Sequence, residues 1–454
     1  MNTRNLRTTA ILLAALCIAA LANAQTVTVL ATFTGPNGAY PWDPLVQGTD
    51  GNFYGTTAGG KLNGTFYAGT VFKMTADGVL TTIAKLGHED PVAGLVQATN
   101  GHYYGAALHG GNGSGSIFEI TPADKLKTIY QFCQPTCIGQ EPSATLIQAL
   151  DRDFYGTLRG GVIYRVTLAG AVTSLATFTG PNGSMPQSGV IQATDGNFYG
   201  TTEFGGQPCA LFTYGCGTVY KMTPDGTLTT LHSFCAQTGC PDGFQSWAGV
   251  IQATDGYLYG LTQEGGSGSC ADPSGCGVAF KITLDGTFTA LATLGALGTR
   301  YPNASFVQAT DSNFYAHGLG GLFQMTPAGA VKVLYQFSYD SSNASLIQST
   351  DGNFYGTTYG ATNSTGHQVN AGTVFRLSMG LAPFVKTQPP AGRVGKSVTI
   401  LGTNLAGATG VTFNGTPVSS FAVNSTNSAI TTTVPAGATT GTVQVTLPSR
   451  LRKK

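Results

Sequence analysis

The stretch at residues 47–55 reads QGTDGNFYG, and it decides the fold because six further copies follow along the chain. The later copies begin at Gln97, Gln148, Gln192, Gln252, Gln308 and Gln348. In each copy a Tyr stands seven residues after the Gln, and the spacing from one such Tyr to the next is 50, 51, 44, 60, 56 and 40 residues. Fixed segments separated by loops of unequal length are typical of a repeat architecture with a period of about fifty residues.

Each repeat predicts four short strands that would form one antiparallel sheet. The apolar pair Val190-Ile191 precedes its Gln, and a Thr-Asp-Gly turn, a strong hairpin signal, leads into the second strand, NFYGTT. The third strand is GTVFKMT at residues 69–75, and the fourth is TLTTLHSF at residues 227–234. Segments rich in Val, Phe, Tyr and Thr and bounded by Gly favour strands over helices. The sequence therefore predicts an all-β protein.

Seven sheets of four strands are typical of a seven-bladed β-propeller. The two ends of the repeat region predict how such a ring closes. The seventh copy ends at GTVFRLSMG, residues 372–380, without a fourth strand, whereas the chain begins with an unassigned fourth strand, TVTVLATF, at residues 26–33. We expect this N-terminal strand to complete the last blade, because closure removes the unpaired strand edges that favour aggregation.

The repeated Gln and Asp residues have structural interpretations. We expect the seven Gln side chains to hydrogen-bond backbone groups between blades, since buried amides need partners, although a polar ring of this kind also offers a ligand site. The repeated Asp residues, such as Asp195 and Asp351, are interpreted as turn residues. No copy has the dense spacing of acidic and amide residues found in a calcium loop, so the sequence predicts neither a metal nor a cofactor.

Residues 1–24 have the features of a secretory signal peptide. Arg4 and Arg7 precede the apolar run ILLAALCIAALA, and residues 22–24, ANA, provide a small-x-small cleavage pattern. Cys17 follows Leu16, a poor match to a lipoprotein acylation site, so we expect release or surface display without a lipid anchor. No later segment is long and apolar enough to span a bilayer. The prediction is a secreted, periplasmic or cell-surface protein that acts as a monomer.

Eight Cys residues follow the leader, an even number that predicts disulfides in an exported protein. They come as near neighbours along the chain: Cys133 with Cys137, Cys209 with Cys216, Cys235 with Cys240, and Cys270 with Cys276. We expect this sequential pairing, with a bond between Cys240 and Cys270 as the alternative, because the fourth and fifth blades adjoin. A zinc site is not expected, since no Cys or His quartet has the usual ligand spacing.

The charge of the chain argues against binding to nucleic acid. The leader holds two of the 22 basic residues and no acidic ones, which leaves 20 basic residues against 21 acidic ones. Charged residues make up only 9% of the sequence, and four of the basic ones lie in the C-terminal RLRKK. The sequence has no basic stripe of the kind that neutralises phosphates.

The repeats stop near residue 381, and a second β-rich domain is predicted from there to residue 454. Its segments VTFNGTPV and VPAGATTGTVQVTL resemble the immunoglobulin-like IPT/TIG domains of bacterial exported proteins, over roughly residues 383–448. The resemblance departs at the end, where SRLRKK replaces the last strand that such domains usually have. The expected division is a signal peptide at 1–24, a propeller at 25–380 and an Ig-like sandwich with a trimmed edge at 381–454.

The repeat motifs DGNFYGTT and GTVYKMTPDGTLTTL resemble the GloVer tandem repeats of bacterial exported proteins, across about residues 26–380. That family is called choice-of-anchor because its C-terminal attachment signals vary. The resemblance implies export and surface association, and it brings no established chemistry. The repeats are also similar, more faintly, to those of the seven-bladed streptogramin lyases, but no catalytic residue carries over from them.

Variable loops on one face of the propeller are the expected place for function, because loops on a rigid scaffold carry most binding sites. The first hypothesis is a non-catalytic binding or adhesion protein whose ligand is a glycan, a peptide or an envelope protein. Its candidate residues are the side chains that these loops bring to that face: Trp42, Tyr67, His109, Arg159, Glu203, Trp247, Glu264, His317 and Tyr359. For each aromatic residue, packing beneath a long loop is the structural alternative.

The second hypothesis is an enzyme, a lyase or a glycoside hydrolase, with its site on the same face. Its general acid or base would be His109 or His317, or the pair Glu203 and Glu264. The six His residues of the chain show no recognisable catalytic pattern. A third hypothesis makes the two domains spacers in a larger envelope assembly.

Overall fold

In the computed structural model of the protein, the described residues are 25–62, 64–87, 90–91, 93–134, 137–209, 211–266, 276–295, 301–318, 321–337, 340–341, 344–361, 371–388 and 392–448. The expected leader, Cys270 and the C-terminal RLRKK lie outside them. Within the described residues the structure is almost entirely β, with one short helix, α1 (Gly110–Gly113). The all-β prediction is confirmed. In this part of the chain, no helix is both long enough and apolar enough to cross a membrane.

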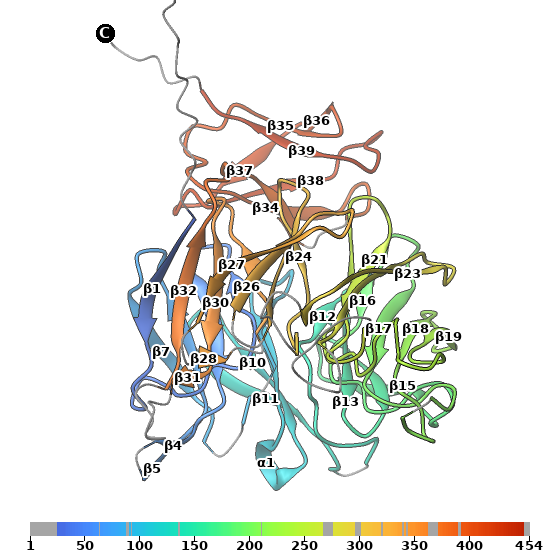
Figure 1. Ribbon diagram of the computed structural model, residues 1–454. Coiled ribbons are helices and arrows are strands. Elements are labelled where there is room, and N and C mark those ends of the chain that lie inside the picture. Colours follow the sequence, from blue (N-terminus) through green and yellow to red (C-terminus); the bar gives the residue numbers. More distant parts are fainter. Residues whose placement is uncertain are drawn as a thin grey trace, which may run out of the picture.

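The repeat region consists, within the described residues, of seven four-stranded antiparallel sheets (Figure 1). The first strands end at the repeat Gln: β2 (Val46–Gln47), β8 (Val96–Gln97), β12 (Ile147–Gln148), β16 (Ile191–Gln192), β20 (Ile251–Gln252), β24 (Val307–Gln308) and β29 (Ile347–Gln348). The second strands contain the repeat Tyr: β3 (Phe53–Thr57), β9 (Tyr103–Ala107), β13 (Phe154–Leu158), β17 (Phe198–Thr202), β21 (Leu258–Leu261), β25 (Phe314–Gly318) and β30 (Phe354–Thr358).

The third and fourth strands complete each sheet. The third strands are β6 (Thr70–Met74), β10 (Ser116–Ile120), β14 (Val162–Val166), β18 (Thr218–Met222), β22 (Val278–Ile282), β26 (Gly321–Met325) and β32 (Thr373–Ser378). The fourth strands are β7 (Leu80–Lys85), β11 (Leu126–Gln131), β15 (Val172–Thr177), β19 (Leu228–Ser233), β23 (Phe288–Thr293), β27 (Val331–Gln336) and β1 (Thr26–Thr32). Two small pairs lie in the connections: β4 (Gly60–Leu62) with β5 (Thr65–Tyr67), and β28 (Asp340–Ser341) with β31 (Gly360–Ala361).

The strand that begins the described chain lies in the same sheet as the last repeat. β1 pairs antiparallel with β32, with Thr26 opposite Ser378 and Thr32 opposite Thr373. The Phe33 N–H extends this pairing by donating to a carbonyl oxygen in the loop before β32 at 2.8 Å. The strand order is therefore β1-β32-β30-β29, which joins the two ends of the repeat region in one sheet.

Successive sheets pack through the aromatic pair at the start of each second strand. Neighbouring side chains on a strand point to opposite faces, so the Tyr of one sheet meets the Phe of the next. The ring centroids of Tyr155 and Phe198 are 4.2 Å apart. The same contact joins the seventh repeat to the first, where the centroids of Tyr355 and Phe53 are 4.1 Å apart. Such ring contacts occur at six of the seven junctions, and at the remaining one Tyr199 packs with Leu258.

The repeat Gln side chains link each sheet to the next, as predicted. Gln47 Oε1 accepts a hydrogen bond from the Thr350 backbone N–H at 3.1 Å, and Gln47 Nε2 donates to the Thr350 hydroxyl at 3.0 Å. The equivalent backbone donors to Gln97, Gln148, Gln192, Gln252, Gln308 and Gln348 are Thr49, Thr99, Leu150, Thr194, Thr254 and Thr310. These bonds satisfy the amide groups and fix the register between sheets.

The repeat Asp residues fold the turns between first and second strands, again as predicted. Asp195 Oδ1 accepts the Asn197 backbone N–H at 3.0 Å, and its Oδ2 accepts the Tyr199 hydroxyl at 2.7 Å. The same two bonds recur at Asp50, Asp151, Asp255, Asp311 and Asp351. The carboxylates are therefore occupied by the turn itself.

The C-terminal domain is an Ig-like sandwich of two sheets, which lies against the Asp-Gly turns of the repeat region (Figure 1). One sheet has the order β33 (Lys386–Gln388), β34 (Ser397–Leu401), β38 (Ala429–Thr433) and β37 (Phe421–Val423). The other has the order β36 (Thr416–Pro417), β35 (Gly410–Phe413) and β39 (Val443–Thr446). Alternating apolar residues such as Val398, Ile400 and Ile430 fill the space between the sheets.

Candidate functional site at the long-loop end

The repeat sheets have two unlike ends. At the short-turn end, the first strand joins the second, and the third joins the fourth, through short turns such as residues 48–52 and 75–79. At the long-loop end, the second strand joins the third, and the fourth joins the next repeat. The second-to-third connections range from two residues after β25 to 16 residues after β21. We build the candidate site at the long-loop end, because the repeats differ there.

A recurrent hydrogen bond organises the long-loop end. The residue four positions after the repeat Tyr donates its N–H to a carbonyl in the loop that enters the same repeat: Arg159 to Glu141 at 3.0 Å, and Glu203 to Met185 at 3.1 Å. Glu141 and Met185 have positive φ angles of 61° and 53°, and a Pro follows each of them. Sequence reasoning missed this turn, although a Pro six residues before the Gln is a usable signal for it.

This turn defines two equivalent side-chain positions in each repeat. We call the residue four after the repeat Tyr the first rim position, and the residue five before the repeat Gln the second rim position. Arg159, Glu203 and Tyr359 occupy the first rim position, and Trp42 and Trp247 occupy the second. Five of the nine predicted site residues therefore fall into two sets that the repeat geometry makes equivalent.

Side chains of the two rim positions pair with each other. Gln187 Nε2 donates to Glu203 Oε2 at 2.6 Å, and Gln263 Nε2 donates to Asn303 Oδ1 at 2.8 Å. Glu203 and Gln263 are 6% and 9% exposed. The prediction missed Gln187, Gln263 and Asn303, because amides in loops of unequal length give no signal until the repeats are aligned on the Pro. The rim thus presents amide and carboxylate groups beside one another.

Three aromatic side chains meet where the seventh repeat adjoins the first, and we call Tyr40, Trp42 and Tyr359 the seam aromatic cluster. The Tyr40 and Tyr359 rings stack with centroids 4.9 Å apart, and Trp42 meets Tyr359 edge-on at 5.0 Å. The Tyr40 hydroxyl donates to the Lys61 carbonyl oxygen at 2.8 Å. Burial, with a smaller effect from the neighbouring Tyr359, raises the pKa of Tyr40, and burial raises the pKa of Tyr359. Trp42 and Tyr359 keep part of their surface exposed.

Buried polar atoms without a hydrogen-bond partner among the described residues occur on the same elements. They are Asp43 Oδ2, Thr357 Oγ1 and Trp247 Nε1. Asp43 replaces a small residue, since the same place in the other repeats holds Ala or Ser. Burial raises the pKa of the Asp43 carboxyl well above its ordinary value. Unsatisfied polar atoms cost free energy, and Asp43 introduces one at a place where the other repeats hold a small residue.

Two predicted site residues lie away from the rim positions. His109 precedes α1, and its Nδ1 lies 3.1 Å from Asp90 Oδ2 in an exposed ion pair. Tyr67 lies in β5, where its ring packs so closely on Gly35 that an added Cβ there would lie 2.5 Å from the ring. Tyr67 thus supports the turn after β1.

The remaining two candidates, His317 and Glu264, lie in positions that the sequence did not predict. His317 lies within β25 and is fully buried, with its ring centroid 5.3 Å from that of Phe337. The expectation of a loop residue is therefore wrong, because β25 is followed by the shortest of these connections. Glu264 stands one residue beyond the first rim position, and its backbone pairs with Phe244. Glu203 and Glu264 are not equivalent residues, so the repeat does not present them as a carboxylate pair.

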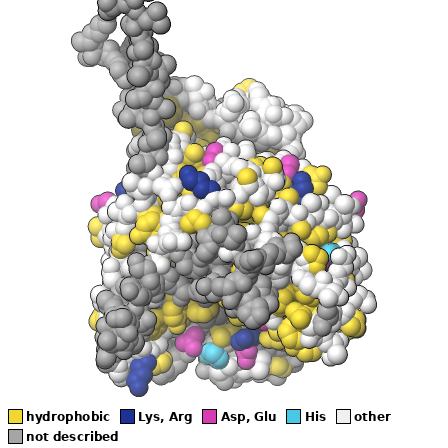
Figure 2. Space-filling view, in the orientation of Figure 1, with side chains coloured by type: hydrophobic (Ala, Val, Ile, Leu, Met, Phe, Trp, Pro, Cys, Tyr) yellow, Lys and Arg dark blue, Asp and Glu magenta, His cyan; other side chains and the backbone are white. Residues whose placement is uncertain are grey.

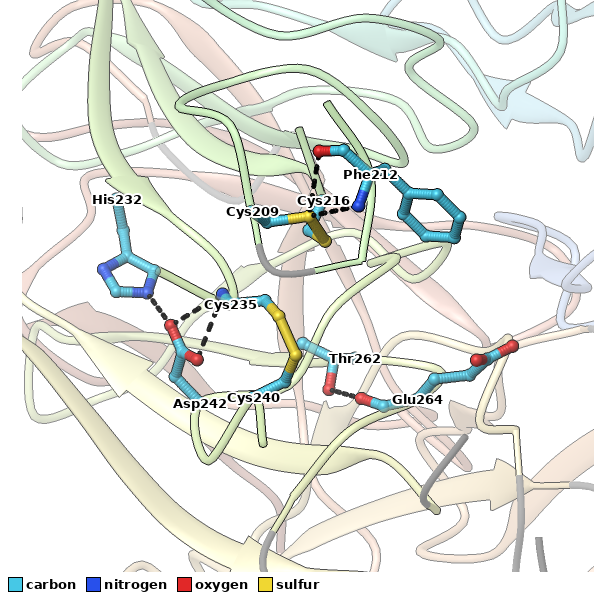
Figure 3. Close-up of a disulfide and its surroundings, with 9 residues drawn as sticks. All are labelled: Cys209, Phe212, Cys216, His232, Cys235, Cys240, Asp242, Thr262 and Glu264. Atoms are coloured by element: carbon cyan, nitrogen blue, oxygen red, sulfur yellow. Dashed lines mark hydrogen bonds and ion pairs between the residues drawn. A yellow bond between two sulfur atoms is a disulfide. The ribbon is translucent and has the colours of Figure 1, made fainter. Parts of the chain in front are cut away.

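The described cysteines follow the sequential pairing. Disulfides join Cys133 to Cys137, Cys209 to Cys216 and Cys235 to Cys240. The alternative bond from Cys240 to Cys270 is excluded by the bond to Cys235. Cys276 is also disulfide-bonded, and its expected partner lies outside the described residues. Figure 3 shows the Cys235–Cys240 disulfide in the same region as the Cys209–Cys216 disulfide.

The surface carries few charges. On the face drawn in Figure 2, basic and acidic side chains are scattered singly and mixed in sign. This distribution agrees with the low charged fraction of the sequence, 9%.

Comparison with models of protein families identifies the family of this chain. Four overlapping segments, 17–160, 61–269, 157–359 and 211–416, match the Gloeobacter/Verrucomicrobia repeat. The chain belongs to the Gloeobacter/Verrucomicrobia repeat family. Residues 384–451 of this repeat protein match the IPT/TIG domain, as the sequence resemblance implied. No curated protein matches the sequence.

Solved structures share the fold of this Gloeobacter/Verrucomicrobia repeat protein at low identity. A catalytically inactive virginiamycin B lyase from Staphylococcus aureus with quinupristin matches with a TM-score of 0.52 and 13% identity, over 78% of this chain and 99% of that one. A streptogramin B lyase matches with a TM-score of 0.51 and 15% identity, over 78% and 97%. The extracellular domain of a hybrid two-component system from B. thetaiotaomicron matches with a TM-score of 0.51 and 13% identity, over 94% and 54%. These likenesses establish a β-propeller-type fold.

Proposed function

We propose that the protein is an exported binding protein that uses the long-loop end of a closed, seven-bladed propeller at residues 25–380 to hold a glycan or a peptide. Closure is supported by the pairing of β1 with β32 and by the hydrogen bond from Thr350 to Gln47, which repeats the bond between every other pair of neighbouring sheets. Export is supported by the disulfides and by the likeness to an extracellular domain.

The seam aromatic cluster is the observation that carries the proposed binding function. Trp42 and Tyr359 keep exposed surface although each touches another ring. Partly exposed aromatic faces next to hydrogen-bonding groups suit ligands that are flat and apolar on one side and polar at the edges, which describes both sugar rings and peptide side chains. The rim pair Gln187 and Glu203 provides further polar groups at the same end, in the fourth repeat. Because the cluster holds together without a ligand, little ordering free energy is needed on binding.

The proposal is tested with the mature protein on glycan arrays and in pull-downs from cell envelopes. We expect enrichment of a defined ligand class, and we expect Trp42→Ala to weaken its binding by about tenfold or more, as for a central aromatic contact. Tyr335→Ala is the matched control, since Tyr335 is 42% exposed on a fourth strand outside the cluster. Equal binding of both variants, with unchanged circular dichroism, would contradict the proposal.

The alternative function, a lyase or glycoside hydrolase at the same end, rests on likeness of fold with the streptogramin lyases. The positions of the candidate groups do not favour it. His317 is buried in a strand, His109 is paired with Asp90 near α1, and the Glu203 carboxylate accepts a hydrogen bond from the Gln187 amide. We therefore assign the long-loop end to binding.

A further inference from the structure

Four sulfur atoms gather beside the long-loop end of the fourth repeat. The Sγ atoms of Cys209, Cys216 and Cys235 all lie within 4.8 Å of one another. Cys240 Sγ is bonded to Cys235 Sγ, which adds a fourth sulfur beside this group of three. We call these four atoms the four-sulfur cluster, and Figure 3 shows the two disulfides that compose it facing each other. Among the described residues, this is the one place where three or more metal-ligating groups come so close.

Separate loops supply the two halves of the four-sulfur cluster. Cys209 and Cys216 lie between β17 and β18, and Cys235 and Cys240 lie between β19 and β20. The Cys209 loop is held by backbone contacts, with the Phe212 N–H donating to Cys209 Sγ at 3.2 Å. These positions bring together residues that are 26 apart in sequence, which is why spacing alone did not predict the cluster.

The second loop is fixed by a carboxylate. Both oxygens of Asp242 accept the Cys235 backbone N–H at 3.1 Å, and Asp242 Oδ2 lies 2.9 Å from His232 Nε2. Cys235 and Cys240 have positive φ angles of 58° and 46°, so the turn that carries them is set by the backbone as well as by the disulfide. The loop therefore retains restraints that do not depend on the bond between the two sulfurs.

Burial protects most of the four-sulfur cluster. Cys216 and Cys235 are 0% exposed and Cys240 is 3% exposed, whereas Cys209 is partly exposed. Apolar residues surround the group, including Phe234 and Phe244. A reductant therefore reaches the cluster from the Cys209 side, and thiolates inside it are shielded from water.

We propose that the four-sulfur cluster is a redox-dependent metal site, which binds one zinc ion or a similar thiophilic ion when both disulfides are reduced. Tetrahedral zinc has Zn–S bonds of about 2.3 Å, which places its sulfur ligands about 3.8 Å apart. Among Cys209, Cys216 and Cys235 the separations of up to 4.8 Å exceed this value by about one ångström, a distance that side-chain rotation covers. The Cys240 sulfur lies outside this group and has to move further to complete the site. Four thiolates select soft or borderline ions over calcium or magnesium.

The redox step balances with an external thiol as reductant. Each disulfide takes two electrons and two protons from a dithiol, which becomes a disulfide in turn. The four resulting thiols release four protons when the metal binds. Under oxidising conditions the same four cysteines form the two disulfides of the present structure. The four sulfurs therefore either form disulfides or bind the metal.

The test uses the mature protein, reduced anaerobically with a phosphine and freed of reductant. Zinc is titrated and its stoichiometry measured, and cobalt is used as a spectroscopic probe for thiolate-to-metal charge transfer. We expect one ion per chain in the reduced protein and none in the oxidised protein. Cys209→Ser and Cys235→Ser are expected to weaken binding on the order of 100-fold. The double variant Cys133→Ser/Cys137→Ser is the matched control, because it removes a disulfide from the corresponding loop after β11 and leaves the cluster whole.

Thermal unfolding followed by circular dichroism separates a lost site from a lost fold. If the reduced protein loses structure, we expect zinc to restore it in the wild-type and control proteins and to leave Cys209→Ser unchanged. The proposal is overturned if the reduced wild type binds no ion. It is also overturned if Cys209→Ser binds zinc as tightly as wild type, or if the Cys133→Ser/Cys137→Ser control loses the charge-transfer band.

Discussion

The short-turn end and the long-loop end of the repeat sheets are built by different rules. At the short-turn end every repeat uses the Gln contact, and six of the seven use the Asp and Tyr contact seen at Asp195 and Tyr199, with Asn100 in place of the Asp in the second repeat. At the long-loop end the side chain four residues after the repeat Tyr varies, as at Arg159, Glu203 and Tyr359. Residues shared by the repeats thus hold the sheets together, whereas the variable residues lie at the end where we propose that a ligand binds.

The Ig-like domain strengthens this contrast, because it covers the short-turn end. Asn424 Nδ2 and Ser428 Oγ both donate to the Thr49 carbonyl oxygen at 2.7 Å. Lys386 Nζ donates to the Gln348 carbonyl oxygen at 3.1 Å, and Gln388 Nε2 donates to that of Gln97 at 2.8 Å. A partly open pocket of about 260 Å³, lined by Asp50, Asn52, Asp351, Asn404 and Asn427 among others, remains between the two parts.

The largest expected effect comes from removing residues 25–33, which include β1. The third strand β32 then has an open edge, and the apolar side chains of β1 no longer cover the sheet. We expect the free energy of unfolding of the repeat region to fall by more than about 4 kcal/mol. Denaturant unfolding measures it, and removal of residues 381–454 is the comparison, for which a much smaller loss is expected. Equal losses would mean that β1 is not part of the propeller.

A medium effect is expected where the ring of Gln contacts crosses from the seventh repeat to the first. Gln47 is 7% exposed and makes two hydrogen bonds to Thr350, so Gln47→Ala leaves buried groups unpaired and is expected to cost about 1–3 kcal/mol. Gln252 makes the equivalent bonds to Thr194 with more exposure, so Gln252→Ala is expected to cost less. Chemical denaturation of both variants measures the difference, and a larger loss for Gln252→Ala contradicts this ranking.

A smaller, pH-dependent effect is expected at the junction with the Ig-like domain. Burial lowers the pKa of Lys386 to about 8 from its ordinary 10.5, against the opposing effect of Asp351. The charged form is disfavoured in the folded protein, so stability is greatest above pH 10.5, falls as the pH is lowered to about 8, and is level below it. We expect Lys386→Met to remove this dependence and to stabilise the junction at pH 7 by on the order of 1 kcal/mol. Unfolding curves at pH 7 and pH 10 measure both, and an unchanged slope with pH would refute the assignment.

The smallest expected effect concerns the two hydrogen bonds to the Thr49 carbonyl oxygen. One comes from the Asn424 amide and the other from the Ser428 hydroxyl. Asn424→Ala and Ser428→Ala each remove one hydrogen bond from a carbonyl oxygen that keeps the other, so about 0.5–1 kcal/mol is expected for each. Neither variant is expected to change ligand binding at the long-loop end. A binding defect in either one would show that the two ends are coupled.

The sequence predicts the regular part of this molecule well, because the repeat sets it. The Gln and Tyr positions locate the first and second strands, and residues 26–33 resemble a fourth strand closely enough to suggest their partner. The role of the Gln side chains also follows, since a buried amide requires a donor and an acceptor. These features depend on contacts that each repeat makes in the same way.

The candidate site is predicted less well, because it depends on loops that differ in length. Trp42 and Trp247 attract attention as aromatic residues, but their shared position, five residues before the repeat Gln, appears only when the loops are aligned on that Gln. In the sequence, His317 falls close to the place where the other repeats have a loop. Its repeat has the shortest connection between second and third strands, so His317 stays inside β25. Cys209 approaches Cys235 only because the loop after β17 and the loop after β19 lie close together. The spacing of the cysteines along the sequence does not predict this.

Hydrogen exchange of the mature protein, measured with and without its captured ligand, locates the binding site. We expect slower amide exchange at residues 40–43 and 357–361, at the seam aromatic cluster, and unchanged exchange at the turns of residues 48–52 and 349–353. Protection of those turns, with unchanged exchange at the cluster, would place the ligand at the short-turn end and contradict the proposed function.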